Sequence, residues 1–444
     1  MVNVLRSLTI PLPSTHPAAT LPLTEFLRPG TLIWSRRDEG LLGFGVSTRA
    51  TFQGPDRFAD AQDWWRSLHR SGAVINDLLL PGTGPVAFGS FAFSRYSQHE
   101  SVLVMPRLLL GRRDGLSWLT LTTVDADAGL TAEEALASLD EVMAQQAFAT
   151  AVPATASEKP DVVWDVVPGS LTETDWKAAV AQAVTAIEGG EVDKVVLARD
   201  LLARSSEPVN RESVLAALAR DYRDCWVYGV GQFVGATPEM LIKVEDGVAR
   251  ARVLAGTVDR AQAPQDPGYP RRELLDSAKQ REEHEFAVRS LVKQLAPFAE
   301  DLHYPAEPFI LELPNVWHLA SDVQARLAAS HLADGGSHLP TSLALVEALH
   351  PTAAVCGTPR TEAGELIQRI EHLERGPYAG PVGWLDAQGN GEWGIGLRGG
   401  VIEGSHQARL YAGCGIVAAS QPEAELAETW AKFRPMLQAL GATS

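Results

Sequence analysis

Cysteine, basic charge and long apolar runs are all scarce in this chain of 444 residues. The three cysteines, Cys225, Cys356 and Cys414, lie far apart and form no C-x-x-C pair, so the sequence supports neither a zinc ribbon nor a disulfide framework. The 55 acidic residues outnumber the 38 basic ones, and the formal net charge of -17 argues against a nonspecific binder of nucleic acid or anionic membranes. No apolar run reaches about 18 residues, so we expect no membrane-spanning segment.

The first residues also lack the features of a signal peptide, because the apolar stretch is short and Pro11 interrupts it. Together with the few thiols, which we expect to be reduced and buried, this favours a cytoplasmic protein.

Several common catalytic motifs are missing or incomplete. Residues 394–399 match G-x-G-x-x-G, but they lie within an expected strand, whereas a dinucleotide site needs a strand before the motif and a helix after it. No G-x-x-x-x-G-K-[ST] phosphate loop occurs. The pair His284-Glu285 begins an H-E-x-x-H zinc motif, but Val288 stands where the second histidine is needed.

The chain has the 45% apolar and 21% charged residues of an ordinary globular protein. In its first third we expect strands at 86–93 and 102–110, the latter with an irregularity at Pro106, and a helix at 132–148. Residues 149–170 are rich in Ala, Thr, Pro and Glu and form the best candidate for a linker.

The remainder of the chain is more regular. Apolar residues recur at helical spacing over 172–187, Thr172 and Asp175 can cap the start, and Gly189-Gly190 can end the helix. Strands and helices each cluster, without strict alternation, which favours an α+β fold with largely antiparallel sheets. We expect further strands at 194–198, 225–234, 240–245, 382–386, 393–403 and 408–416, and further helices at 272–298, 362–374 and 423–440.

Two acidic clusters admit two interpretations each. Glu425, Glu428 and Lys432 share one face of the helix at 423–440, either as a solvated charged face or as carboxylates directed at Mg²⁺, which prefers one or two protein carboxylates. The cluster at 282–285 in the helix at 272–298 leaves the same two interpretations open.

Lys194 opens an otherwise apolar strand, where it either reaches the surface or is held in a cleft that lowers its pKa and lets it act as a base. The small residues at 411–416 form either a tight turn or a place where backbone N–H groups approach an anion.

Taken together, the segments from about residue 170 to the C-terminus resemble the chorismate-utilising enzyme family, and Phe88-Gly-Ser-Phe-Ala-Phe93 is similar to the family's weaker first half. The matching segments, in chain order, are Val192-Asp-Lys194-Val-Val-Leu-Ala-Arg199, Phe233-Val-Gly-Ala-Thr-Pro-Glu239-Met-Leu, Leu254-Ala-Gly256-Thr257, Arg281-Glu-Glu283-His-Glu-Phe, Val316-Trp-His318-Leu, His350-Pro-Thr352-Ala-Ala354-Val-Cys-Gly357-Thr-Pro359, Gly376-Pro-Tyr378-Ala-Gly380-Pro-Val-Gly-Trp, Leu397-Arg398, Arg409-Leu-Tyr-Ala-Gly413-Cys-Gly415-Ile and Glu425-Leu-Ala-Glu428-Thr-Trp-Ala-Lys432.

The resemblance implies a single large α+β domain, with two stacked, mostly antiparallel sheets flanked by helices. Residues 1–150 would be the weaker N-terminal half of that domain, 151–170 a surface linker, and 171–444 the chorismate-binding catalytic part.

The resemblance also implies a set of site residues. Glu283 and Glu428 would bind Mg²⁺, which would hold the ring carboxylate of chorismate. Arg398 and Lys432 would pair with the substrate carboxylates, as suits a planar guanidinium and an ammonium. The backbone from Gly413 to Gly415 would donate to the enolpyruvyl carboxylate, and the pocket would be lined by Gly256, Thr257, His318, Thr352, Ala354 and Tyr378.

The activity that this implies is an isomerase (hydroxymutase) reaction, the conversion of chorismate into isochorismate by addition of water at C2 and loss of the C4 hydroxyl. Such a step needs a base and an acid, for which we expect Lys194 and Glu239. Ammonia-using members of the family usually lack the lysine, and no glutaminase segment is present, so we expect no glutaminase subunit. The alternatives are salicylate synthesis, which adds pyruvate elimination, and a catalytically silent chorismate-binding subunit. We expect a monomer with chorismate as its partner, serving menaquinone or siderophore biosynthesis.

Overall fold

The computed structural model describes residues 4–69, 72–125, 129–145, 162–259, 266, 268–312, 316–331 and 337–442. The chain forms two compact units. The larger unit comprises Met1–Glu239, Pro351–Ala387 and Gly394–Ser444, and the smaller unit comprises Met240–His350 and Gln388–Trp393.

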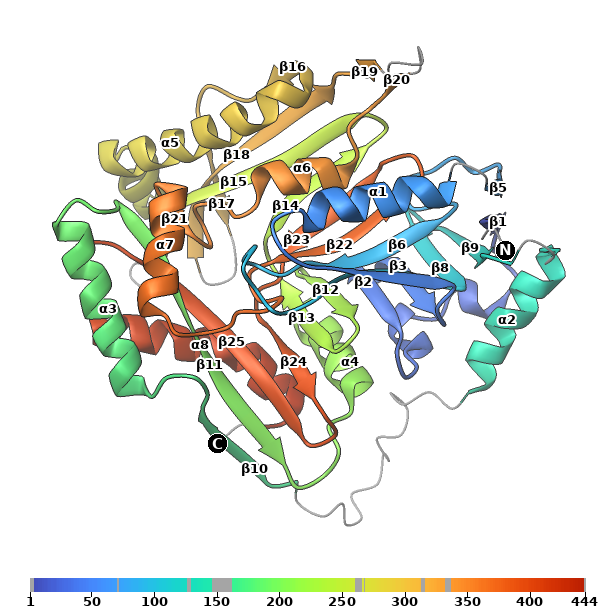
Figure 1. The fold of residues 1–444 in the computed structure, drawn as a ribbon, viewed down its shortest axis with the longest axis horizontal. Helices are drawn as coiled ribbons and strands as arrows, with labels where there is room; N and C mark the ends of the chain where they lie inside the picture. Colours follow the sequence, from blue (N-terminus) through green and yellow to red (C-terminus); the bar gives the residue numbers. More distant parts are fainter. Residues whose placement is uncertain are drawn as a thin grey trace. The chain divides into compact units, whose positions relative to one another are not determined.

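One large sheet lies within the larger unit (Figure 1). Neighbouring strands in it are antiparallel apart from the parallel pair of β1 (Arg6–Pro11) and β5 (Ala73–Asn76). β21 (Gly357–Thr358) pairs with the first residues of β11 (Lys194–Ser205). Its strand order is β10 (Trp164–Pro168), β11 (Lys194–Ser205), β25 (Gln407–Ile416), β24 (Gly399–Glu403), β13 (Phe233–Thr237), β12 (Trp226–Val230), β2 (Leu32–Arg36), β3 (Glu39–Phe44), β8 (Leu108–Arg113), β9 (Leu116–Thr123), β1 (Arg6–Pro11) and β5 (Ala73–Asn76).

A second sheet contributes β22 (Pro381–Asp386), β6 (Val86–Ser90), β7 (Ser101–Met105) and β4 (Thr48–Phe52) to the larger unit, again in antiparallel pairs. β12 of the first sheet packs against β6 and β22, so the two sheets are stacked there. Trp34, Phe88 and Trp384 are fully buried. Burial of such large apolar side chains is the main stabilising contribution to this core.

Helices cover the outer faces of the larger unit. α8 (Pro422–Leu440) packs on β25 and contacts both α3 (Glu173–Glu188) and α4 (Arg211–Asp221), as Figure 1 shows for α3 and α8. α7 (Arg360–Ile370) packs on β11, α1 (Arg57–His69) on β4, and α2 (Ala132–Ala144) on β8 and β9.

The start and end of α3 follow the expected signals. The Thr172 hydroxyl accepts a hydrogen bond from the Asp175 amide at 3.1 Å, which satisfies one of the unpaired N–H groups at the helix start. The chain leaves the helix through Gly189 and Gly190, and Gly190 has a φ of +75°, which favours glycine. The apolar face of Trp176, Val180 and Ala183 is buried as predicted.

In the described part of the smaller unit, antiparallel strands follow the order β16 (Ala299–His303), β18 (Val316–Leu327), β15 (Val248–Asp259) and β14 (Met240–Glu245). β17 (Phe309–Glu312) also pairs with β18, and β19 (Ser330–His331) pairs with β20 (Ser337–His338). α5 (Ala278–Leu295) packs on β15 and β18, where the buried His284 ring nitrogen Nε2 lies 2.8 Å from the Ser321 hydroxyl. α6 (Ser342–Leu349) packs on β14 and α5.

Three segments that were each predicted as one continuous strand are divided in the structure, so these three predictions are wrong. The segment 102–110 is divided between β7 and β8, because Pro106 lacks the N–H that a continuous ladder needs. The segment 225–234 is the β12–β13 hairpin, which turns at Gly231 with a φ of +57°. The segment 393–403 is divided between β23 (Gly391–Ile395) and β24.

Helix boundaries also shift. The helix expected at 272–298 begins only at Ala278, where the Ser277 hydroxyl caps the Gln280 amide, and a π-helical turn at Arg271–Leu275 precedes it. Of the expected linker at 149–170, residues up to 161 lie outside the described part of the chain, and β10 occupies its end. The part of the expected 132–148 helix beyond residue 145 also lies outside the described part.

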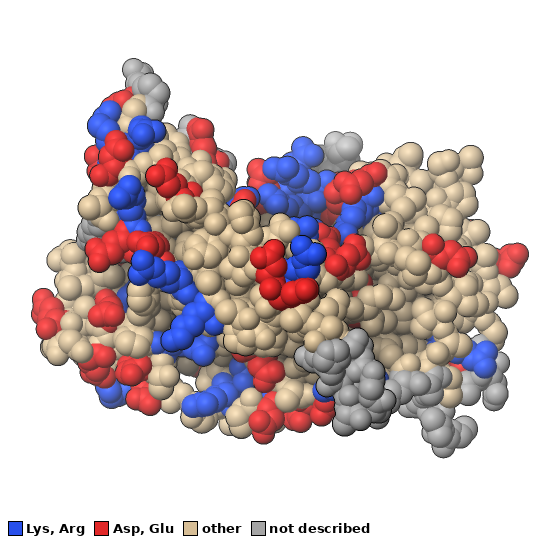
Figure 2. Space-filling model, turned by 90° about the horizontal axis from the view of Figure 1, so that it is seen from above, with Lys and Arg blue, Asp and Glu red and all other residues tan. Residues whose placement is uncertain are grey.

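The α+β class with two large, mostly antiparallel sheets flanked by helices is confirmed. None of the helices within the described ranges combines the length and apolar character that crossing a bilayer requires. On the face drawn in Figure 2, acidic and basic side chains are interspersed, so neither sign of charge dominates it.

Candidate active site

Lys194 is the first residue of β11, where its backbone lies opposite Thr358 of β21. Its side chain is half-buried and crosses the face of Gly415 in the neighbouring strand β25. A Cβ atom at position 415 would lie 2.7 Å from the Lys194 Cε and 3.3 Å from its Nζ. Glycine at position 415 therefore leaves the space that the lysine side chain occupies.

Glu239 follows β13, where its amide donates to the Thr237 hydroxyl at 3.2 Å and its carbonyl accepts from the Ile395 amide at 3.0 Å. Burial of the carboxyl raises the pKa of Glu239 above the ordinary 4.5, and the positive charges of Lys194, Lys432 and Arg398 oppose that rise. The structure therefore brings three predicted cationic residues into electrostatic range of one predicted carboxylic acid.

Lys432 lies on α8 and is half-buried. Its ammonium donates to the Gly413 carbonyl at 2.8 Å and forms an ion pair with Glu428 at 2.5 Å, one turn earlier on the same helix. The backbone of Gly413 thus contributes an acceptor to Lys432. The predicted donation from Gly413 and Gly415 to a substrate carboxylate stays a prediction.

Arg398 lies between β23 and β24 with a φ of +50°, and its carbonyl accepts from the Ala236 amide at 3.3 Å. Its guanidinium interacts electrostatically with Tyr378. Burial raises the pKa of Tyr378, and the positive charges of Arg375 and Arg398 oppose that rise. The Tyr378 ring stacks on Tyr411 with ring centroids 5.2 Å apart and planes 10° apart. Tyr378 is therefore a neutral, buried aromatic side chain that stacks on Tyr411 and interacts with the Arg398 charge.

Thr352 and Ala354 lie in the turn at the start of the segment Pro351–Ala387. The amides of Val355 and Cys356 donate to the Thr352 carbonyl at 3.2 and 3.0 Å, which fixes this turn. The Thr352 hydroxyl oxygen is buried and has no hydrogen-bond partner in the described part of the chain. A buried hydroxyl of this kind is suited to a substrate oxygen, since buried polar atoms are rarely left unpaired.

Three further predicted residues lie together in the smaller unit. Thr257 of β15 pairs in register with His318 of β18, and a β-bulge occurs between Ala255 and Thr257. Gly256 forms this bulge with a φ of +80°, a conformation that favours glycine. Burial lowers the pKa of His318, whereas a hydrogen bond with the Gly256 backbone acts to raise it. The net pKa is below the ordinary 6.5, so the ring is neutral near pH 7.

Comparisons with known proteins identify the family of this chain. The sequence profile of the family described as "Chorismate binding enzyme" matches residues 2–441. This chain belongs to the chorismate binding enzyme family.

Named relatives cover most of the chain. Isochorismate synthase MenF of Bacillus subtilis (strain 168) is 33% identical over 427 residues, which span 92% of this chain and 87% of that protein. The salicylate biosynthesis isochorismate synthase of Pseudomonas aeruginosa is 32% identical over 423 residues, or 93% of this chain and 85% of that protein. The solved structure of MenF, the menaquinone-specific isochorismate synthase from Escherichia coli, superposes with a TM-score of 0.73 at 26% identity and covers 99% of this chain and 95% of that one.

The structure describes some, but not all, of the carboxylate side chains that are expected to hold a cation in this chorismate binding enzyme. Glu428 is exposed, Glu425 is half-buried one turn earlier on α8, and the side chain of Glu283 on α5 lies outside the described residues. Within the described ranges, no group of three or more His, Cys, Asp or Glu side chains could hold a metal ion. The α8 carboxylates nevertheless fit Mg²⁺, which takes one or two protein carboxylates and completes its shell with water and substrate oxygens.

Sequence reasoning missed Glu371 and Arg375. These two side chains are 2% and 3% exposed and form a two-bond ion pair, in which Arg375 Nε and Nη2 each donate to a Glu371 oxygen at 2.6 Å. Arg375 directly precedes the matching segment Gly376-Pro-Tyr378, so an arginine next to a quoted motif and four residues after a glutamate was the available signal.

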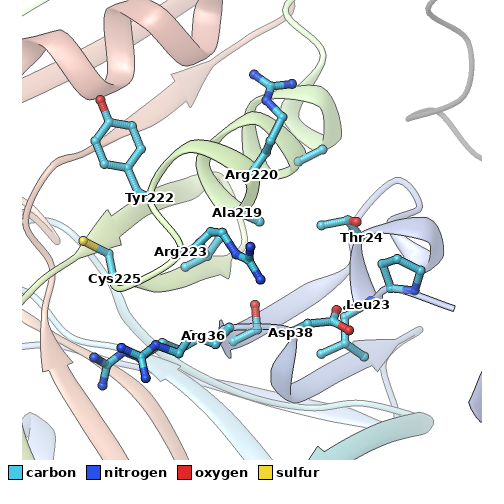
Figure 3. A pocket seen from close by; sticks show the side chains of 14 residues that line it. Leu23, Thr24, Arg36, Asp38, Ala219, Arg220, Tyr222, Arg223 and Cys225 are labelled. Carbon is cyan, nitrogen blue, oxygen red and sulfur yellow. Dashed lines mark hydrogen bonds between the residues drawn. The ribbon is translucent and has the colours of Figure 1, made fainter. Parts of the chain in front are cut away.

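A cavity of about 280 Å³ in the larger unit contains none of the predicted site residues (Figure 3). Its lining includes Leu23, Arg36, Ala219, Arg223 and Cys225. Its arginines are largely engaged with neighbours: Arg36 stacks over the Trp226 ring at 4.3 Å, Arg37 pairs with Asp224, and Arg220 pairs with Asp221.

Proposed function

We propose that this chain is an isochorismate synthase, an isomerase that converts chorismate into isochorismate with Mg²⁺ as cofactor. The relatives that cover most of its length carry that name. The observation that carries the proposal is Glu239, a carboxylic acid with a raised pKa within electrostatic range of Lys194. A base and an acid of this kind are what the hydration of chorismate requires.

In the proposed reaction, the neutral amine of Lys194 takes a proton from water while the water oxygen bonds to C2. The two ring double bonds shift, the C4–oxygen bond breaks, and the proton of the Glu239 carboxyl leaves with that oxygen as a second water. One water is consumed and one is released, so substrate and product are isomers. Return of the proton from Lys194 to Glu239 restores both groups.

Substrate binding in this proposal uses the remaining predicted residues. Arg398 and Lys432 pair with the two substrate carboxylates, and Thr352, Ala354, Tyr378, Gly256, Thr257 and His318 contact the ring and its substituents. Glu283 and Glu428 are the proposed ligands of Mg²⁺, which when bound offsets the charge of the substrate carboxylate. The enzyme acts on this small molecule in the cytoplasm as a monomer, without a glutaminase subunit, a nucleic acid or a membrane.

Product chromatography tests the proposal. The purified chain is incubated with chorismate and Mg²⁺, and isochorismate, salicylate and pyruvate are separated and quantified. We expect isochorismate to approach a fixed ratio with chorismate. Stoichiometric salicylate and pyruvate would instead identify a salicylate synthase, and unchanged chorismate that still raises the melting temperature would identify a silent binding subunit.

A further inference from the structure

Beyond Lys194 and Val195, the edge of β11 is closed first by the Cys356 carbonyl, which accepts from the Val196 amide at 2.8 Å, and then by side chains. β21 pairs with Lys194 and Val195, and β10 pairs with Leu201 through Ser205. Between them, the Val196 carbonyl accepts from Arg375 Nη2 at 2.7 Å, and the Ala198 amide donates to Glu371 Oε2 at 2.8 Å. The Ala198 carbonyl accepts from the indole N–H of Trp176 at 3.2 Å. The buried ion pair therefore supplies hydrogen bonds that a neighbouring strand would otherwise make.

The same ion pair reaches a second segment. Arg375 Nη1 donates to the Val355 carbonyl at 2.9 Å, in the turn that carries Thr352 and Ala354. The Arg375 guanidinium also lies over the Phe93 ring at 4.2 Å from its centroid. Burial works against the charge of this guanidinium, but Glu371 more than offsets it, so the pKa of Arg375 is raised and the guanidinium stays charged.

A third segment follows Arg375 directly along the chain. The Arg375 carbonyl accepts from the Tyr378 amide at 2.9 Å, and the Gly376 carbonyl accepts from the Phe93 amide at 2.9 Å. One ionic group thus joins the strand of Lys194, the turn of Thr352 and the segment of Tyr378.

We propose that Glu371 and Arg375 are positioning residues that hold the Lys194 strand, the Thr352 turn and the Tyr378 segment in register for the reaction. This inference rests on the proposed role of Lys194. Residues two apart in a strand share a face, so a displacement of Val196 moves Lys194 with it. A displacement of about 1 Å in a reacting group lowers a rate by about 10²-fold.

The substitution Arg375→Lys tests the proposal, because lysine keeps the positive charge but cannot make the planar set of bonds to Glu371, Val196 and Val355. We expect kcat to fall about tenfold or more, with the KM for chorismate changed by less than about threefold. Glu371→Gln, which keeps the side-chain size, should give the same split and faster hydrogen exchange at the Ala198 amide.

Arg211→Lys is the matched control. Arg211 is 8% exposed, pairs with Glu212 at 3.1 Å, and donates to the carbonyls of Gly231 and Thr31 at 2.8 and 3.0 Å. It contacts none of the predicted site segments among the bonds described. We expect Arg211→Lys to lower the melting temperature to a similar degree while kcat stays within about twofold of the unsubstituted enzyme.

The proposal is overturned if folded Arg375→Lys and Glu371→Gln retain kcat, or if they lose no more than Arg211→Lys does. If neither variant folds, hydrogen exchange in the unsubstituted protein decides: the Ala198 amide should be protected as strongly as strand-paired amides of β11, and rapid exchange there contradicts the proposal. Absence of isochorismate formation by the unsubstituted enzyme would remove the proposed function instead, which is a distinguishable result.

Discussion

At the scale of single residues, the two proposed catalytic groups need protonation states opposite to their usual ones. Lys194 has to be neutral to accept a proton, and Glu239 has to be protonated to donate one. Burial raises the pKa of Glu239 in spite of three nearby positive charges, which shifts this carboxyl toward the protonated form that the proposed role needs. The same cations would stabilise the carboxylate that forms once the proton has left.

The pH dependence of Glu239→Gln follows from this raised pKa. The Glu239 carboxyl has a higher pKa in the folded protein than the ordinary value of 4.5. It therefore lowers the stability of the fold as the pH rises from 4.5 through the raised pKa. The glutamine side chain of the variant does not titrate and has no such effect. We expect Glu239→Gln to melt higher than the unsubstituted protein above that window and no higher below it. Its kcat should fall about 10²- to 10⁴-fold, because an amide cannot act as the acid.

Thermal melts from pH 4 to 8 and steady-state rates measure both effects. An equal melting difference at every pH would contradict burial of a titrating carboxyl, and near-normal turnover would remove Glu239 from catalysis.

The residues that could be predicted from sequence were those in segments that resemble a known family. That resemblance identified Glu239 and the three cationic residues Lys194, Arg398 and Lys432. The charges of these three residues act on the Glu239 carboxyl. Glu371 and Arg375 could not be identified as a pair, because their importance comes from burial and from bonds to strands that are distant in sequence. A charged residue at i and i+4 is usually a solvated surface pair, and nothing in the sequence distinguishes the buried case.

At the scale of elements, β11 and β25 act together. β25 lies between β11 and β24, and its small residues Gly413 and Gly415 are opposite Ala198 and Val196 of β11. Gly413 receives Lys432 from α8, and Gly415 makes room for Lys194. Sequence alone left open whether these glycines form a tight turn, and the structure places them within a strand.

Gly415→Ala should separate folding from activity. The added methyl group would approach the flexible end of Lys194 and no backbone atom, so the lysine side chain has to move while the strand can remain. We expect the melting temperature to change by no more than a few degrees, within about 0.5–1 kcal/mol of stability, and kcat to fall about tenfold or more.

The control for this variant is Gly129→Ala, where the added methyl group meets open space. Both proteins are compared by thermal melting, chorismate binding and turnover. Unchanged turnover in Gly415→Ala would show that the position of the Lys194 side chain is not critical.

Element types were predicted more reliably than their boundaries. Helix α3 and strand β22 agree closely with expectation because their caps and apolar periodicity are local signals. The segment 393–403 was expected as one strand because both halves are apolar, but Arg398 adopts a positive φ and the chain passes from one sheet to the other. That change depends on tertiary pairing, which no local pattern specifies.

At the scale of the whole molecule, the α+β class and the two antiparallel sheets were predictable because strand and helix patterns cluster along the chain. The division into a larger and a smaller unit was not predicted, because the smaller unit is formed by an insertion within the longer sequence and by a few residues near Trp393. The expected boundaries at 150 and 170 remain predictions.

The proposed Mg²⁺ dependence is tested on the whole enzyme. If Mg²⁺ offsets the substrate charge, EDTA should abolish turnover, and added Mg²⁺ should restore it. We expect Glu428→Ala to raise the Mg²⁺ concentration needed for half-maximal rate by about tenfold or more, since one carboxylate ligand is lost.

Glu423→Ala provides the comparison, because Glu423 is an exposed carboxylate of the same helix that pairs with Lys177 at 2.9 Å. Its Mg²⁺ dependence should be unchanged. Full activity in EDTA would exclude the two-glutamate site.

The most direct measurement compares Lys194→Ala with the unsubstituted enzyme in two assays, isochorismate formation and equilibrium binding of chorismate in the presence of Mg²⁺. With Lys194 as the base, turnover should fall by about 10²- to 10⁴-fold while the Kd for chorismate changes by less than about threefold. Isochorismate formation at an undiminished rate in Lys194→Ala would contradict the account.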